Sequence, residues 1–312
     1  MRSPPALEFG IGLPVVQQVP AQAQAWEATA GAAEILQVAR AADRLGYAWV
    51  GCSDHVAVPA SYAPSMGATW YEPTTTLAFV AAATARVRLL SHVLVLPYRH
   101  PLLAAKAFAT LDALSGGRAV IGAGSGHLKP EFHSLGIDHQ ARAALSDEYL
   151  LGLAAALEQA VSSFDGATVG WRDMMVAPRP VQQPRPPIWI GGNSPAMARR
   201  AGRCGDGWIP WQIAPEDFAA GAAVAREAQR ASGRLGAFIC VAPLAAGRVD
   251  DVAALVEAVR AWAAGGATAF HLGFQHRSAA DLCELLERFA LEVVPLACAD
   301  RPAGRTADDG ET

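Results

Sequence analysis

The sequence predicts a single-domain α/β fold of the (β/α)8 TIM-barrel type. Eight apolar runs alternate with helical patterns over residues 1–298 of the 312-residue chain. Glycine-rich segments follow two of these runs directly, at 124–126 and 191–192. Ligands of parallel α/β proteins bind at the carboxyl ends of the strands. The alternation therefore also predicts where the functional site lies.

The elements follow one another in a regular order. We expect strands at 8–13, 47–52, 91–96, 118–123, 188–190, 207–210, 237–243 and 267–272. We expect helices at 33–45, 74–84, 101–115, 142–161, 196–203, 215–231, 252–264 and 279–291. A doubly wound sheet is the alternative, but it would more often place its phosphate loop after the first strand, where Gly12-Leu13-Pro14 is a poor match.

Two insertions interrupt this order. A long loop at 56–71 follows the second strand, and an irregular piece at 128–139 follows the fourth. Asp165-Gly166 is a hairpin turn signal within 164–175, which we expect to lie outside the barrel. Residues 299–312 are polar and are expected to form a disordered tail.

Composition excludes several classes of function. The net charge of −4 and the absence of a basic run argue against nucleic-acid binding. Five widely spaced cysteines without a CxxC pair argue for a reducing compartment and against a zinc site. The first ten residues have no apolar signal core, and no run reaches the length of a membrane span. We expect a soluble cytoplasmic protein with no membrane partner.

Asp54-His55, directly after the second strand, is the most reactive pair in the sequence. An imidazole titrates near neutrality and can donate or accept a proton. The structural alternative is that Asp54 caps a turn and His55 is a packed loop residue. Further histidines near strand ends could suggest a metal, namely His92, His127 and His271. Asp54 is the only carboxylate among the strand-end residues, so we expect no catalytic metal.

The two glycine-rich segments indicate a binding surface of bare backbone. Where side chains are missing, a planar ring or a phosphate can approach the backbone N–H groups. The segments after the fourth and fifth strands consist of Gly124, Ser125, Gly126, Gly191, Gly192, Asn193 and Ser194.

Six segments in the same order resemble the luciferase-like monooxygenase superfamily, and specifically its actinobacterial branch of coenzyme F420-dependent oxidoreductases. The segments are Gly46-Tyr47 with SDHVAVP at 53–59, LVLPYRHP at 94–101, LDALSGGR at 111–118, GAGSG at 122–126 with Glu131-Phe132, PIWIGGNSP at 187–195, and GDGW at 205–208.

The resemblance implies a deazaflavin lying across the strand ends. It implies a non-prolyl cis peptide in the third strand, at Ser91-His92 or His92-Val93, that supports the ring. It further implies that Asp54 hydrogen-bonds the ring edge, and that the two glycine-rich segments hold the ribityl and phosphate portions. His55 would face the transfer site as the acid or base. The implied reaction is direct hydride transfer between C5 of F420 and a substrate carbon.

The predicted substrate is small and either apolar or aromatic. The sugar-phosphate branch of the family has an acidic residue where this chain has His127, so glucose 6-phosphate is an unlikely substrate. We expect the loop at 56–71 to form a lid, and we expect the substrate to be lined by Tyr62, Trp70, His127, Trp208 and Trp211.

Three other functions remain open at this point. One is an FMN-dependent monooxygenase that uses O2 and a separate flavin reductase. The others are a non-catalytic flavin-binding barrel and a metal hydrolase. The resemblance also allows a homodimer and a flavin or F420 reductase as partner.

Overall fold

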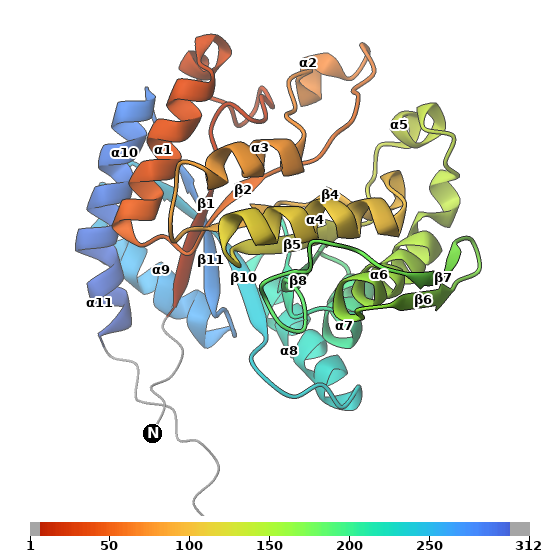
Figure 1. Cartoon of the computed structure of the whole chain (residues 1–312). Helices are drawn as coiled ribbons and strands as arrows, with labels where there is room; N and C mark the ends of the chain where they lie inside the picture. Colours follow the sequence, from red (N-terminus) through yellow and green to blue (C-terminus); the bar gives the residue numbers. More distant parts are fainter. Residues whose placement is uncertain (1–6, 300–312) are drawn as a thin grey trace, which may run out of the picture.

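Parallel strands close into an eight-stranded barrel in the computed structural model of this chain, which describes residues 7–299 (Figure 1). Around the barrel the order is β3-β2-β1-β11-β10-β9-β8-β5, and pairing of β3 with β5 closes it. The strands are β1 (Glu8–Gly12), β2 (Trp49–Cys52), β3 (Arg88–Ser91), β5 (Ala119–Gly124), β8 (Ile188–Gly191), β9 (Gly207–Ile209), β10 (Ile239–Gly247) and β11 (Ala269–Phe274). The predicted fold class is confirmed.

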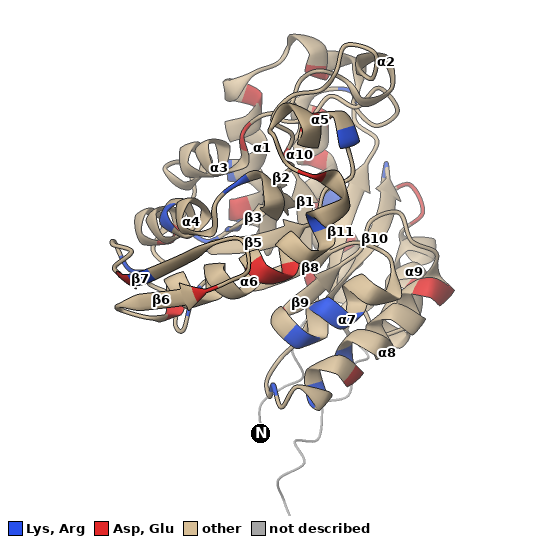
Figure 2. Ribbon diagram, turned by 90° about the vertical axis from the view of Figure 1, so that its right-hand side faces the viewer, with Lys and Arg blue, Asp and Glu red and all other residues tan. Residues whose placement is uncertain are grey.

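Helices surround the barrel and carry most of the charged residues (Figure 2). The helices that follow the strands are α1 (Ala32–Leu45), α3 (Pro73–Ala81), α4 (Pro101–Ser115), α6 (Arg142–Glu158), α7 (Pro195–Cys204), α8 (Pro215–Ala231), α9 (Val252–Ala264) and α10 (Ala279–Arg288). Shorter helices are α2 (Ala63–Met66), α5 (Lys129–Ser134) and α11 (Val294–Cys298). Pro101 begins α4, and Gly116 ends it in the left-handed conformation, as the sequence indicates.

The third strand differs most from its prediction. It ends at Ser91, where 91–96 was expected to be the strand, and the chain continues through a cis peptide at His92–Val93 into the two-residue strand β4 (Leu94–Val95). The sequence hides the start of β3 because its first residue, Arg88, is charged. That guanidinium pairs with Glu8 at the amino ends of the strands, so an ionic residue occupies a strand position.

The insertions also take shape. The hairpin consists of β6 (Ser162–Asp165) and β7 (Gly170–Met174), as Asp165-Gly166 predicted. The piece at 128–139, expected to be irregular, contains α5. The predicted disordered tail lies outside the described residues except for Ala299. No helix in the described part of the chain is long and apolar enough to cross a membrane.

Side chains fill the barrel below its carboxyl ends. The indole rings of Trp49 and Trp189 meet edge to face there, with centroids 5.3 Å apart. Leu90, Val120 and Val241 pack around them and are fully buried. A β-carbon at Gly10 would lie 2.1 Å from the Trp49 ring, so this position must stay bare. Because the interior is packed, a ligand can enter only from the carboxyl end.

Candidate active site

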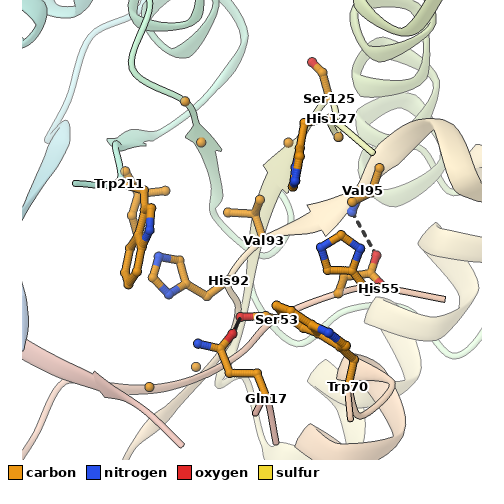
Figure 3. A pocket seen from close by; sticks show the side chains of 18 of the residues that line it. Gln17, Ser53, His55, Trp70, His92, Val93, Val95, Ser125, His127 and Trp211 are labelled. Carbon is orange, nitrogen blue, oxygen red and sulfur yellow. Dashed lines mark hydrogen bonds between the residues drawn. The ribbon is translucent and has the colours of Figure 1, made fainter. Parts of the chain in front are cut away.

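A cavity of about 560 Å³ opens at the carboxyl ends of the strands (Figure 3). Its size is typical of small-molecule sites. Most of the predicted site residues line it: Asp54, His55, Trp70, His92, Val93, Gly124, Ser125, Gly126, His127, Gly191, Gly192, Ser194 and Trp211. The pair after the second strand and the two glycine-rich segments therefore meet at one rim.

Bare backbone surrounds the centre of this cavity. A β-carbon at Gly124 would lie 2.6 Å from Cγ2 of Val93, and one at Gly191 would lie 3.0 Å from its Cγ1. The cis peptide at His92–Val93, which the resemblance left between two bonds, is located at the second of them. Val93 thus occupies the space that side chains of the neighbouring strands would need, and leaves a low floor.

His55 is held by a carboxylate that sequence reasoning did not assign. Nδ1 of His55 lies 2.8 Å from Oε2 of Glu131, which also accepts a 2.8 Å hydrogen bond from the Tyr98 hydroxyl. Oε1 of Glu131 accepts the backbone N–H groups of Val56 and Ala57. Burial would raise the pKa of Glu131, but these hydrogen bonds outweigh burial and hold its pKa below the usual value. The carboxyl is therefore ionised and takes the Nδ1 proton of His55, which leaves Nε2 as the other reactive atom.

Aromatic rings flank the His55 imidazole on the cavity side. The ring centroid of Trp70 lies 4.4 Å from that of His55, and the ring of His127 lies 5.7 Å away. Burial lowers the pKa of His127, so this second imidazole is neutral near pH 7. Neighbouring rings restrict the motion of His55 and exclude water from one side of it.

The carboxylate of Asp54 is engaged by protein groups. Oδ2 accepts hydrogen bonds from Val95 N at 2.9 Å and Arg99 Nη1 at 2.6 Å, and Oδ1 accepts one from Arg99 Nη2 at 2.9 Å. Asp54 is 4% exposed. The pairing ties the end of β2 to the segment that follows β4, so Asp54 has a structural role whether or not it also touches a ligand.

One end of the cavity, near β5 and β8, is suited to an anion. Arg142 lines it and has no ion pair with any carboxylate of the described chain; its Nη1 donates to the His139 carbonyl at 2.8 Å. Ser194 caps the N-terminus of α7, whose free N–H groups and dipole favour negative charge. Nη1 of Arg200 donates to Ser125 Oγ at 3.0 Å, while Asp147 neutralises this second guanidinium (Figure 2). Arg142 is the uncompensated cation of the site.

Two imidazoles lie together on the opposite side of the floor. The ring centroids of His92 and His271 are 4.2 Å apart, and the Trp211 ring lies 5.8 Å from the first and 6.0 Å from the second. Burial lowers the pKa of His92 from 6.5 to about 4. Burial, with His92 beside it, also lowers the pKa of His271 well below its usual value. Both rings are neutral at pH 7.

This depressed pKa predicts acid sensitivity of the fold. Between pH 6.5 and pH 4 the unfolded chain binds a proton at His92 that the folded chain does not, so stability falls as the pH drops through this window. After allowance for partial solvation in the cavity, we expect His92 to account for a loss of about 2 kcal/mol. Urea unfolding at pH 7 and pH 4.5 measures it. The His92→Leu variant should lose less stability than the wild type over that interval, and equal losses would contradict the assignment.

Four predicted residues lie outside the cavity lining. Trp208 is fully buried behind the wall: its ring stacks on Phe218 at 5.3 Å, and Nε1 donates to the Gly192 carbonyl at 2.8 Å. It supports the glycine segment and does not border the substrate space. Successive residues of a strand face opposite sides, and Trp208 faces the helices. Tyr62, in the lid segment, is 42% exposed.

Ser91 and Asn193 act within the protein framework. Ser91 is buried, and its hydroxyl donates to the Gly122 carbonyl at 3.0 Å. The Asn193 side chain holds the backbone of Trp211, since its Oδ1 accepts the Trp211 N–H at 2.9 Å and its Nδ2 donates to the carbonyl. Asn193 thus positions an aromatic wall of the cavity.

Sequence reasoning missed Glu131, Arg142 and Gln17 as site residues. Glu131 lay within a quoted segment, but its contact with His55 spans 76 positions. Gln17 follows β1, and its Oε1 accepts the Ser53 hydroxyl proton, which leaves its amide nitrogen free (Figure 3). An excess of arginine over nearby acids at the start of α6 was the available signal for Arg142.

The fold and this site define a flavin- or deazaflavin-type oxidoreductase barrel, and comparison with known proteins gives the family. The chain matches the luciferase-like monooxygenase family model over residues 7–292. This chain belongs to the luciferase-like monooxygenase family.

Two curated relatives match parts of the chain. An uncharacterised protein of Sinorhizobium fredii, y4wF, is 36% identical over 169 residues, which are 54% of this chain and 47% of that protein. An FMNH2-dependent dimethylsulfone monooxygenase of Pseudomonas putida is 35% identical over 128 residues, 40% of this chain and 35% of that protein. The matches thus span less than half the length of either relative.

Solved structures share the fold. An F420-dependent secondary alcohol dehydrogenase, in complex with an F420-acetone adduct, has a TM-score of 0.75 at 16% identity, covering 94% of this chain and 99% of that one. The oxygenating constituent of 3,6-diketocamphane monooxygenase from Pseudomonas putida, in complex with FMN, has a TM-score of 0.73 at 16% identity, covering 93% and 98%. Neighbours of this fold therefore include users of both cofactors.

Proposed function

We propose that this chain is an F420-dependent oxidoreductase that transfers a hydride between C5 of the deazaflavin and a carbon of a small, apolar or aromatic substrate. The observation that carries the proposal is the His55–Glu131 couple beside a floor of bare backbone. Hydride transfer to a polar double bond leaves negative charge on the substrate heteroatom, which then needs a proton. A positioned imidazole meets this need.

The residues at the rim fit a ring with an anionic tail. Gly124 and Gly191 leave room for a planar ring over the His92–Val93 peptide. Arg142 and the N-terminus of α7 would hold the phosphate. Bound there, F420 would supply the hydride donor or acceptor; the protein supplies the orientation and the proton.

His55 would move the proton through Nε2. Glu131 accepts the Nδ1 proton, so the neutral imidazole presents an Nε2 acceptor that can take a proton from a hydroxyl. The protonated imidazole can return it to a carbonyl oxygen in the opposite direction. Glu131 stabilises this protonated form and keeps the ring orientation fixed.

The walls on the His55 side favour an uncharged substrate. Trp70, Val16 and Val19 line the cavity there, and the one lining carboxylate, that of Asp54, is engaged by Arg99. An isolated bridge between Gln17 and Trp70 fastens the lid segment to the end of β1. With a cofactor ring inside about 560 Å³, only a small substrate fits beside it.

An FMN-dependent monooxygenase, served by a separate flavin reductase and using O2, is the second candidate. The observation in its favour is the partial similarity to the FMNH2-dependent dimethylsulfone monooxygenase. Fluorescence quenching during separate titrations of the purified protein with F420 and with FMN tests the choice of cofactor. Oxidation of reduced F420 without O2, over a panel of small ketones and aldehydes, supports the first candidate. Turnover only with reduced FMN and O2 supports the second, and binding without turnover supports the non-catalytic alternative.

Arg142 gives a prediction on cofactor affinity. Because a hydrogen bond to a charged group contributes about 1.5–3 kcal/mol, Arg142→Ala should raise the Kd of F420 or FMN about 10- to 100-fold. The Kd of riboflavin, which has no phosphate, should stay the same. Arg203→Ala removes an exposed arginine of α7 outside the cavity lining and is the control. An equal loss of FMN and riboflavin affinity in Arg142→Ala would contradict the phosphate assignment.

A further inference from the structure

A group of polar atoms on the floor of the cavity has no partner within the described chain. The Nδ1 atom of His271 is buried and forms no hydrogen bond. The ring nitrogens of His92, the Nε1 atom of Trp211 and the amide nitrogen of Gln17 likewise form no side-chain hydrogen bond to described residues. These side chains come from the ends of β1, β3, β9 and β11 and all line the cavity. We call Gln17, His92 and His271 the polar corner.

The polar corner is rigidly built. His92 and His271 are in ring contact at 4.2 Å, and Trp211 closes one side while its backbone is clamped by Asn193. A β-carbon at Gly51 would lie 3.2 Å from Cβ of His92, so the neighbouring strand end must stay bare to admit the imidazole. Ser53 fixes the Gln17 amide. Buried polar groups in folded proteins are normally hydrogen-bonded, so unpaired groups held in fixed positions call for a ligand.

The polar corner selects for a neutral partner. Both imidazoles are uncharged at pH 7, and the carboxylate of Asp54 is already paired with Arg99. A charged ligand group would meet no counter-ion here and would bear its full desolvation cost. Neutral imidazole offers one donor and one acceptor, and the glutamine amide offers donors. The complementary chemistry is a flat, uncharged edge that carries both carbonyl oxygens and N–H groups.

The polar corner lies across the barrel mouth from the anion-binding end. Gln17 and His271 follow β1 and β11, while Arg142, Ser125 and Ser194 lie beside β5 and β8, which the strand order places on the other side. Figure 3 shows His92 and Val93 between these two ends. A ligand anchored by its phosphate near Arg142 and lying over the His92–Val93 peptide would extend its ring toward the corner.

We propose that Gln17, His92 and His271 form the subsite that binds the pyrimidinedione edge of the cofactor ring. This inference rests on the proposed function, since it requires a flavin or deazaflavin in the cavity. The edge is present in both FMN and F420, so the subsite serves either cofactor and recognises the neutral imide. A second source of the same chemistry is an amide or ketone substrate, which the test separates from the ring.

His271→Phe tests the proposal on the full chain. Phenylalanine keeps a ring against His92 and removes a nitrogen that lacks a partner, so the melting temperature of the cofactor-free protein should not fall. The Kd of FMN and of F420 should rise about tenfold, as expected for loss of a buried hydrogen bond. In Raman spectra of bound FMN, the ring carbonyl bands should move to higher frequency. His271→Asn, which can restore a polar atom near Nδ1, should recover part of both signals, and the exposed His133→Phe is the control.

Each outcome decides a separate point. Unchanged carbonyl bands in His271→Phe, with FMN still bound, would overturn the subsite while leaving the proposed function intact. Unchanged cofactor affinity with a raised substrate KM would assign the corner to the substrate and also overturn it. If the wild type binds neither FMN nor F420, the proposed function fails before the subsite is tested.

Discussion

Replacing His55 with glutamine is expected to lower kcat by about 10²- to 10⁴-fold, the range that general acid–base catalysis contributes. Glutamine keeps a polar side chain of similar reach but cannot carry a proton at neutral pH. Arg142 and the bare ends of β5 and β8 remain, so the Kd of F420 should change little. Steady-state oxidation of reduced F420 with an active substrate, together with fluorescence titration, measures both quantities. Wild-type turnover in His55→Gln would show that the proton passes through another group.

Glu131→Gln is the companion variant, because Glu131 acts through His55. The amide can turn its oxygen or its nitrogen toward Nδ1, so the ring loses the partner that fixes its tautomer. We expect turnover between those of the wild type and His55→Gln. The 15N NMR shifts of the His55 ring should show a mixture of tautomers. Tyr98→Phe removes one donor to Glu131 but keeps the carboxylate, so it should have the smaller effect. Wild-type nitrogen shifts in Glu131→Gln would rule out the positioning role.

Local patterns in the sequence predicted most of the framework of this site. Apolar runs followed by small residues marked the strand ends, and Asp165-Gly166 marked the hairpin. These features depend on neighbouring residues and on backbone preferences, so they can be read from short windows. The resemblance added the region of the cis peptide, which spacing alone does not indicate.

Contacts between distant segments could not be predicted in this way. Glu131 reaches His55 across 76 positions, and Arg99 reaches Asp54 across 45. Both depend on how the insertions fold over the barrel mouth. Trp208 illustrates a different difficulty: β9 has only three residues, Gly207–Ile209, too few for alternation to indicate which face its tryptophan occupies. The indole was therefore expected in the cavity, and it packs against the helices.

Asp54→Ala is expected to destabilise the fold by about 3 kcal/mol, because removing one member of a buried ion pair leaves the other uncompensated. The Asp54 side chain is 1% exposed and that of Arg99 22%, so the effect should lie at the lower end of the range for fully buried pairs. The Val95 N–H would also lose its acceptor. Arg99 would retain only the more distant Glu72, at 3.5 Å. Urea unfolding of the cofactor-free protein measures the change.

A double-mutant cycle separates this structural role from a role in binding. Arg99→Leu combined with Asp54→Ala removes both charges, so the double variant should be less destabilised than the sum of the two single variants. Asp54→Asn keeps an acceptor for Val95 and should fall between Asp54→Ala and the wild type. If Asp54→Ala were as stable as the wild type but bound F420 or FMN more weakly, the carboxylate would serve the ligand rather than the loop. If stability and affinity fall together and recover together in the double variant, the ion pair acts by holding the rim of the cavity in place.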